Sequence, residues 1–112
     1  MKKQSFGKKE RVHNRKQYVN IYRRGGRVHS TNFTVILSPN PSGEKRLGVA
    51  VSKRVGNAVK RNRIKRLLRE FFRLNKDGLP DSQDMVIIAK KDVPLLKYQD
   101  VCLELADLLR KK

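Results

Sequence analysis

Acidic residues are scarce in this chain of 112 residues: ten Asp and Glu stand against 28 Lys and Arg, and the net charge is +18. A charge of this size destabilises a folded domain by self-repulsion, so it indicates a polyanionic partner. Nucleic acid is the first candidate and an anionic membrane surface is the second. The few carboxylates also argue against a metal-dependent nuclease, which needs them clustered.

Other absences bear on the compartment. The chain has one Cys and so no internal disulfide, which is typical of a reducing cytoplasm. No apolar run approaches the roughly 20 residues that a membrane-spanning helix needs. The first residues, MKKQSFGKKERVHNRK, are basic without an apolar segment, so they do not predict a secretory signal. We therefore expect a cytoplasmic protein with no membrane contact.

The residue types of protein-based catalysis are not arranged for it. His13 and His29 have no Cys or acidic residues at metal-ligand spacing, and no Ser-His-Asp, Cys-His or paired-carboxylate pattern stands out. Asp77, Asp81 and Asp84 surround a turn; we expect solvated loop acids there, with weak Mg²⁺ binding as the alternative. The sequence predicts no catalytic residue and no strong metal site in the protein.

The apolar pattern predicts one α+β domain over residues 1–112, with a flexible basic arm at residues 1–12. Helical spacing and turn residues place the helices, and period-two alternation places the strands. The expected order is α-β-β-β-α-β-α: a helix at 14–24, strands at 27–30, 32–37 and 46–53, a helix from about 57 to 75, a strand at 84–90 and a helix from about 98.

Two of these strands alternate large and small side chains, which predicts a sheet with one bulky face and one open face. The bulky, core-facing set is Phe33, Val35, Leu37, Leu47, Val49 and Val51. The opposite, open set is Thr34, Ile36, Ser38, Gly48, Ala50 and Ser52.

The stretch KRVGNAVKRNRIKRLLREFFR, residues 53–73, holds nine Lys or Arg and a single acid, Glu70. At 100° per residue, one side of the predicted helix is apolar and the other basic. Like charges four residues apart cost about 0.2–0.5 kcal/mol per pair, so an external anion is expected to balance them. A merely solvated face would carry mixed signs. The apolar side is Ile64, Leu67, Leu68 and Phe71, and the basic side is Asn62, Lys65, Arg66, Arg69 and Arg73, with Arg61 and Arg63 at the flanks.

The start of this helix is a second possible anion site. Lys53 and Arg54 follow a strand, and Gly56-Asn57 precede the helix, where unpaired backbone N–H groups favour an anion. Taken alone, an ordinary strand-to-helix turn explains the pattern better.

The segment KRVGNAVKRNRIKRLLRE, with Arg61, Asn62 and Arg63 at its centre, resembles the signature of the protein subunit of bacterial ribonuclease P. The shorter stretches YVNIY, FTVIL, LGVAVSK and IIAKK resemble that family as well, so the resemblance covers most of the chain. It implies the same α-β-β-β-α-β-α order, with an uncommon left-handed crossover between parallel strands that nothing in the residue spacing reveals.

The resemblance also implies a function in the bacterial cytoplasm. Ribonuclease P removes the 5′ leader from precursor tRNA, its catalyst is a large RNA, and Mg²⁺ serves the hydrolysis at the RNA site. The protein would be a non-catalytic RNA-binding subunit, inactive alone, whose partners are the catalytic RNA and the single-stranded leader. No obligate protein partner is expected.

Carried over by position, the resemblance assigns two surfaces. Tyr18 and Tyr22 offer rings for base stacking where many relatives have Phe, and Ile36 stands where some relatives have an aromatic residue. From the residues alone, core positions explain both tyrosines better than a binding cleft. The leader cleft would comprise Tyr18, Tyr22, Thr34, Ile36, Ala50 and Ser52. The RNA-facing set would be Lys53, Arg54, Lys60, Arg61, Asn62, Arg63, Lys65, Arg66, Arg69 and Arg73.

Three other classes of protein compete with this hypothesis. A ribosomal-type structural RNA-binding protein explains the charge and the small size, but it does not require an aromatic cleft. A self-sufficient nuclease lacks convincing carboxylates. A membrane-surface protein would need an exposed apolar helix face, whereas Ile64, Leu67 and Phe71 are expected in the core.

Overall fold

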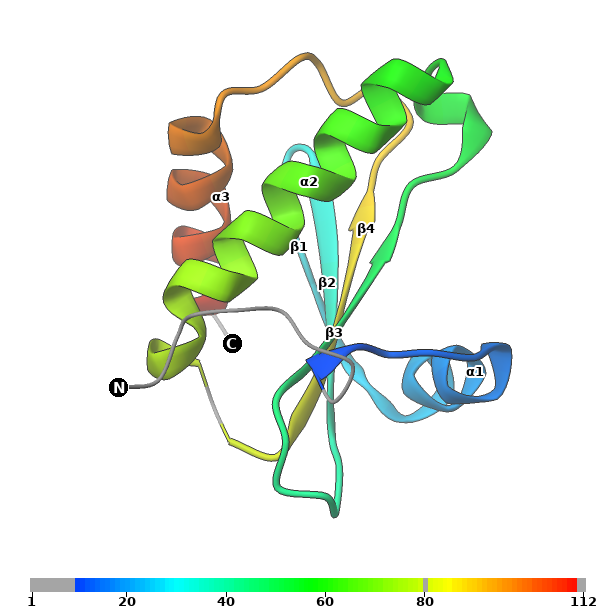
Figure 1. The fold of residues 1–112 in the computed structure, drawn as a ribbon, viewed down its shortest axis with the longest axis vertical. Helices are drawn as coiled ribbons and strands as arrows, with labels where there is room; N and C mark the ends of the chain where they lie inside the picture. The colour runs from blue at the N-terminus through cyan, green and yellow to red at the C-terminus, as the bar shows by residue number, and fades with distance from the viewer. Residues whose placement is uncertain (1–9, 80, 111–112) are drawn as a thin grey trace.

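The computed structural model describes residues 10–79 and 81–110 and shows a four-stranded sheet with three helices (Figure 1). The strands lie side by side in the order β1-β2-β4-β3. The predicted α+β class and element order are confirmed. The elements are α1 (Arg15–Arg24), β1 (Gly26–His29), β2 (Phe33–Pro39), β3 (Arg46–Ala50), α2 (Ala58–Asn75), β4 (Gln83–Ala89) and α3 (Tyr98–Arg110), with short 3₁₀ turns η2 (Lys53–Val55) and η3 (Lys76–Gly78).

The sheet is mixed. Strand β2 pairs antiparallel with β1 and with β4, whereas β3 pairs parallel with β4, Leu47 opposite Met85. The parallel pair is joined through α2, so α2 is the crossover helix that the resemblance implies. The hand of this crossover stays a prediction.

Helices α2 and α3 lie on one side of the sheet and α1 lies on the other (Figure 1). The predicted bulky face packs under α2 and α3, and Phe72 joins the predicted apolar side of α2 in that core, while Leu67 and Val49 are only half-buried. The main core includes Phe33, Val35, Leu37, Leu47, Val51, Ile64, Leu68, Phe71, Phe72, Met85, Ile87, Val101, Leu105 and Leu108.

A second apolar cluster fills part of the face that was expected to be open. Ile21 of α1 packs with Ile36 and Val86 of the sheet and with Val12. Ile36 is 0% exposed, so the expectation that it lines an accessible cleft is wrong. The cause is the close approach at Gly25, where an added Cβ would overlap Ile36 Cγ2. Glycine therefore allows α1 to end directly over Ile36.

Residues 10–12 are part of the folded domain. Val12 is buried, its N–H donates to the Leu47 carbonyl at 2.9 Å, and Glu10 pairs with Lys76 at 2.6 Å. The expected arm at residues 1–12 is therefore corrected at its end, and residues 1–9 lie outside the described part of the chain. This contact covers part of the outer edge of β3, which would otherwise offer unpaired backbone groups.

Asp84 is not the solvated loop acid that the sequence predicted. It lies on β4, is 5% exposed, and accepts from Arg46 Nε and Nη2 at 2.6 and 2.8 Å and from Asn40 Nδ2 at 2.8 Å. Register explains the contact, because Arg46 of β3 is the neighbour of Asp84 in the parallel pair. Its carboxylate is thus used to tie β3 to β4 and to the turn after β2.

Side-chain caps explain where the two functional helices begin. Asn14 Oδ1 accepts from the Gln17 N–H at 2.9 Å, and the Gln17 side chain accepts from the Asn14 N–H, so α1 starts with a capping box. Asn57 Oδ1 accepts from the Lys60 N–H at 2.9 Å, so Asn57 is the N-cap of α2. No helix in the described residues is long and apolar enough to cross a membrane.

Candidate nucleic-acid interface

The exposed side of α2 carries the basic face that the helical wheel predicted. Asn62, Arg66 and Arg69 are exposed, and with Glu70 and Arg73 they line a shallow hollow along the helix. At 100° per residue these positions fall on one side, away from the buried Ile64 and Leu68. The core therefore fixes the orientation of this face, and the arginines are presented as one row.

Three arginines of α2 make specific hydrogen bonds within the protein. Arg73 donates to Glu70 through Nε and Nη2 at 3.0 and 2.8 Å, and these hydrogen bonds lower the pKa of Glu70. Arg61 is half-buried and donates to the Gly56 carbonyl at 3.2 Å, and Arg63 donates to the Leu96 carbonyl at 3.3 Å. Arg61 and Arg63 therefore also support the start of α2.

The remaining basic residues extend the face toward the start of the helix. Lys53 and Arg54 are exposed on η2, while Lys60 and Lys65 are half-buried on α2. Gly56 links η2 to α2 with φ 157°, and the Lys60 side chain lies over it. Of the predicted RNA-facing set, Asn62, Arg66, Arg69 and Arg73 form one row along α2, the basic ridge, whereas Lys60 and Arg63 line a separate hollow at the start of the helix.

The aromatic pair of α1 lies against the other face of the sheet. Tyr18 and Tyr22 meet edge to face, with ring centroids 6.2 Å apart and planes at 67°. Both are half-buried, packing on the cluster beneath them while keeping exposed surface. The guanidinium carbon of Arg27 lies 5.8 Å from the Tyr22 ring centroid, a cation–π contact that the sequence did not suggest.

Strand register gives the floor beside this aromatic pair. Thr34, Ile88 and Ala50 are neighbours in one row across β2, β4 and β3. Ser52 follows the end of β3 and is exposed. Thr34 is buried and Ile88 and Ala50 are half-buried, with the Thr34 hydroxyl 3.0 Å from His29 Nδ1. Ile88 was missed, although it alternates within the predicted strand. It takes the accessible aliphatic position that the resemblance gave to Ile36.

The two surfaces meet around β3. Tyr18 lies over Gly48 of that strand, and burial raises the pKa of its hydroxyl, with Tyr22 adding to the rise. A backbone hydrogen bond from Val49 and the positive charge of Arg69 lower it. In the described residues β3 is an edge strand of the sheet and α2 packs on its other side, so the basic face of α2 and the aromatic pair flank the same strand.

Gly48→Ala should disturb this surface from beneath. The added Cβ would lie 2.7–2.9 Å from the ring and hydroxyl of Tyr18, closer than carbon atoms approach without moving. We expect Tyr18 to be displaced and the free energy of unfolding to fall by about 1–3 kcal/mol. Chemical denaturation measures the change in stability; Gly26→Ala, where the Cβ meets nothing within 4 Å, is the control. Equal stability of the two variants would contradict this packing.

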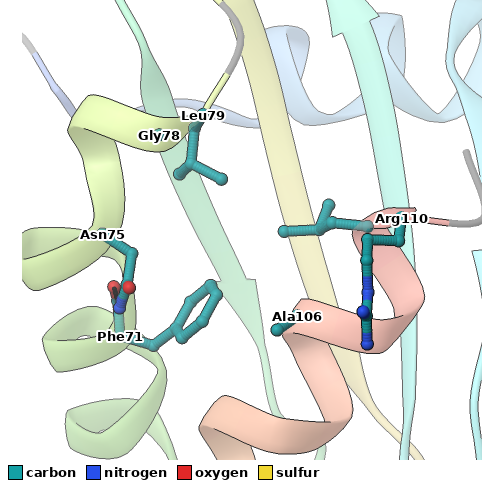
Figure 2. Close-up of a pocket in the computed structure, with 7 residues that line it drawn as sticks. Phe71, Asn75, Gly78, Leu79, Ala106 and Arg110 are labelled. Carbon is teal, nitrogen blue, oxygen red and sulfur yellow. Dashed lines mark hydrogen bonds between the residues drawn. The ribbon is translucent and has the colours of Figure 1, made fainter.

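A second hollow lies between the ends of α2 and α3. Figure 2 shows Phe71, Leu79 and Ala106 around it, with Asn75 and Arg110 at its rim. Its lining is mostly apolar, and it does not include the predicted RNA-facing residues. Within residues 10–79 and 81–110, no three His, Cys, Asp or Glu side chains lie together as a metal site. We therefore do not assign this hollow to the function.

The fold, the basic ridge and the aromatic pair define a small α+β nucleic-acid-binding protein. A family model described as Ribonuclease P matches residues 6–112. The ribonuclease P protein component of Syntrophus aciditrophicus is 54% identical over 100% of this chain and 94% of its own length. That of Desulfovibrio desulfuricans is 45% identical over 90% of this chain and 81% of its own length. This chain belongs to the family of ribonuclease P protein components.

Solved structures agree with this assignment. The RNase P protein of Staphylococcus aureus superimposes with a TM-score of 0.84 at 31% identity, covering 91% of this chain and 94% of that one. The RNase P protein of Thermotoga maritima gives a TM-score of 0.83 at 31% identity, covering 92% and 97%. The resemblance stated from the sequence is therefore confirmed, and the chain is an RNA-binding protein subunit of ribonuclease P.

Proposed function

We propose that this RNA-binding subunit works by gripping two RNA segments at once: the catalytic RNA on the α2 ridge and the single-stranded 5′ leader of precursor tRNA beside Tyr18 and Tyr22. The observation that carries the proposal is that the two surfaces flank the same edge strand, β3: Tyr18 lies over Gly48 of this strand, and α2 packs on its other side. A protein with these surfaces joined can bind substrate next to the catalyst. A ribosomal-type protein that only coats folded RNA would not need the aromatic pair.

The α2 ridge suits RNA phosphates. Arg66 and Arg69 are exposed, and their planar guanidinium groups can each hold two phosphate oxygens. The one acid within the hollow, Glu70, is already bound to Arg73, so it offers little repulsion to an incoming phosphate. Binding should release counterions and weaken steeply with salt.

The aromatic pair suits unstacked bases. Tyr22 presents a ring that Arg27 already flanks. The row of Thr34, Ile88 and Ala50 on the sheet forms the floor of the site next to this ring. The small side chains of Thr34 and Ala50 leave room for a nucleotide beside Ile88, and stacking is tolerant of base identity. Such a site can accept leaders of different sequence.

The hydrolysis itself is proposed to belong to the RNA, with Mg²⁺ supplied at the RNA site. The protein's part is to bind and orient RNA. By neutralising phosphates, Arg66, Arg69 and Lys65 would also let the RNA fold and hold Mg²⁺ at lower concentrations of the ion. We propose a bacterial cytoplasmic setting for this work.

Reconstitution tests the proposed function. The purified protein, a bacterial ribonuclease P RNA and a precursor tRNA are mixed at low Mg²⁺, and release of the leader is followed. The proposal predicts cleavage of the precursor when the protein and the ribonuclease P RNA are both present, and no cleavage by the protein alone. Cleavage by the protein alone would identify a nuclease instead, and RNA binding without any stimulation would favour a structural RNA-coating protein.

Tyr22→Ala should weaken precursor binding selectively. Loss of one stacking ring is expected to lower the affinity of the assembled enzyme for precursor tRNA about tenfold. Mature tRNA, which has no leader, should bind as before, and Tyr22→Phe should keep most of the affinity because the ring remains. Equal reductions for precursor and mature tRNA would contradict leader binding at this site.

A further inference from the structure

One residue on the basic side of α2 does not fit a purely ionic surface. Val59 lies in the first turn of the helix and is 80% exposed. Its spacing to Asn62, Arg66 and Arg73 is three, seven and fourteen residues, which places all four on one side of the helix. The RNA-facing row therefore begins with an exposed aliphatic side chain.

A second exposed aliphatic residue lies beside Val59. Leu95 is 71% exposed, and with Val55 and Val59 it lines a largely apolar hollow at the start of α2. The segment that carries Leu95 joins β4 to α3 and passes the start of α2 (Figure 1). It is held there by the hydrogen bond from Arg63 to the Leu96 carbonyl at 3.3 Å. The hollow is thus built by two separate segments.

The rim of this hollow is cationic. Lys60 and Arg63 line it together with Asn57, and Lys53 and Arg54 stand on the adjoining turn η2. The first turn of α2 contains no acid. An apolar floor with a basic rim matches a nucleotide, whose base has an apolar face and whose phosphate is an anion.

We propose that this hollow, lined by Val55, Val59, Leu95 and the stems of Lys60 and Arg63, seats one unpaired nucleotide of the catalytic RNA. The base or ribose packs on Val59 and Leu95, and its phosphate meets Lys60 and Arg63. Aliphatic side chains on nucleic-acid-binding surfaces act in this way when they pack against unstacked bases. The proposal rests on the proposed function and adds a shape-reading contact to the ionic ridge.

Charge favours RNA over the other occupants of an exposed apolar patch. A second copy of this chain would bring another +18 protein against Lys53, Arg54, Lys60 and Arg63, and the repulsion would oppose pairing. The hollow also lies on the same side of α2 as the ridge, because Val59 and Arg66 are seven residues, or two helical turns, apart. A nucleotide adjoining an RNA segment already held by Arg66 can reach it without a separate binding event.

The test removes the apolar floor without changing any charge. Val59→Ser and Leu95→Ser are combined, and Leu103→Ser on α3, 74% exposed, is the control. Affinity for the ribonuclease P RNA should fall about five- to tenfold in the double variant, the scale of partly exposing two aliphatic side chains. The dependence of affinity on salt should keep its slope, because every basic side chain that meets a phosphate is still present; Lys60→Ala should reduce that slope by about one.

Chemical probing of the RNA bases supplies the second readout. At least one unpaired base should be protected by the wild-type protein and by Leu103→Ser, and should become reactive with the double variant. Unchanged affinity and protection would overturn the proposal, as would self-association of the wild-type protein that the double variant abolishes. If wild type restores leader release while the double variant behaves identically, only this proposal fails; if wild type binds no RNA, the proposed function fails with it.

Discussion

The double substitution Arg66→Ala and Arg69→Ala should lower the affinity of the protein for the catalytic RNA by about a hundredfold, because each guanidinium is expected to contribute a charge-assisted contact to phosphate. Both side chains are exposed on the same face of α2, and the buried residues of that helix are on the opposite side. The fold should be retained, since exposed substitutions typically change stability by about 0.5 kcal/mol or less. Removing two of the like charges along the ridge also relieves repulsion, which does not lower the stability of the helix.

The measurement is a binding titration at several salt concentrations, with thermal unfolding in parallel. The slope of log affinity against log salt should decrease by about two, one for each arginine that no longer neutralises a phosphate. Arg110→Ala, an exposed arginine of α3 that pairs with Asp107, is the matched control and should leave the slope unchanged. Unfolding of the double variant at low temperature, or an unaltered slope, would contradict the assignment of α2 as the phosphate-binding element.

Asp84→Ala should be strongly destabilising, lowering the free energy of unfolding by about 2–4 kcal/mol. The carboxylate is buried and accepts from two Arg46 nitrogens and from Asn40. Its removal leaves the Arg46 guanidinium without its partner beside the core and frees the turn after β2. Because β4 is the one strand of the described sheet that pairs with β3, the substitution should act on the strand that supports Tyr18.

Denaturant unfolding of Asp84→Ala and of Asp81→Ala separates burial from charge. Asp81 is also an acid paired with a basic residue, Lys45 at 3.4 Å, but its side chain is 88% exposed. An exposed pair contributes about 0–1 kcal/mol, so Asp81→Ala should be nearly neutral. Similar destabilisation of the two variants would show that the buried position of Asp84 does not matter.

Periodicity and turn residues carried the prediction of the elements. In α2 the apolar residues Ile64, Leu68 and Phe71 repeat at helical spacing, and Asn57 starts the helix, so both its core side and its basic side follow from local information. The alternation in β2 likewise assigned Phe33 and Val35 to the core correctly. Where the pattern is local, the sequence is sufficient.

The errors arise where a distant segment decides burial. Alternation correctly puts Ile36 on the face opposite the main core, but it cannot show that α1 returns to cover it through Gly25. Val12 follows a basic stretch that resembles a flexible arm, yet one backbone hydrogen bond and a buried side chain place it at the edge of β3. Asp84 looked solvated because its partner, Arg46, is 38 residues away in the sequence.

The candidate site shows the same division. The wheel predicted the row of Asn62, Arg66 and Arg69, and it would also have singled out Val59 as the apolar exception on that side. The contacts of Arg61 with Gly56 and of Arg63 with Leu96 depend on the path of the chain and could not be predicted from spacing. The assignment of each residue to catalytic RNA or to leader stays a prediction.

Site-directed photocrosslinking in the reconstituted enzyme tests the central claim most directly. A photoreactive amino acid takes the place of Arg66 in one protein and of Tyr22 in another, and the crosslinked RNA is identified. The proposal of two surfaces predicts that position 66 labels the catalytic RNA and that position 22 labels the 5′ leader of precursor tRNA. Neither position is expected to label mature tRNA instead. Crosslinks from both positions to the catalytic RNA alone would contradict it.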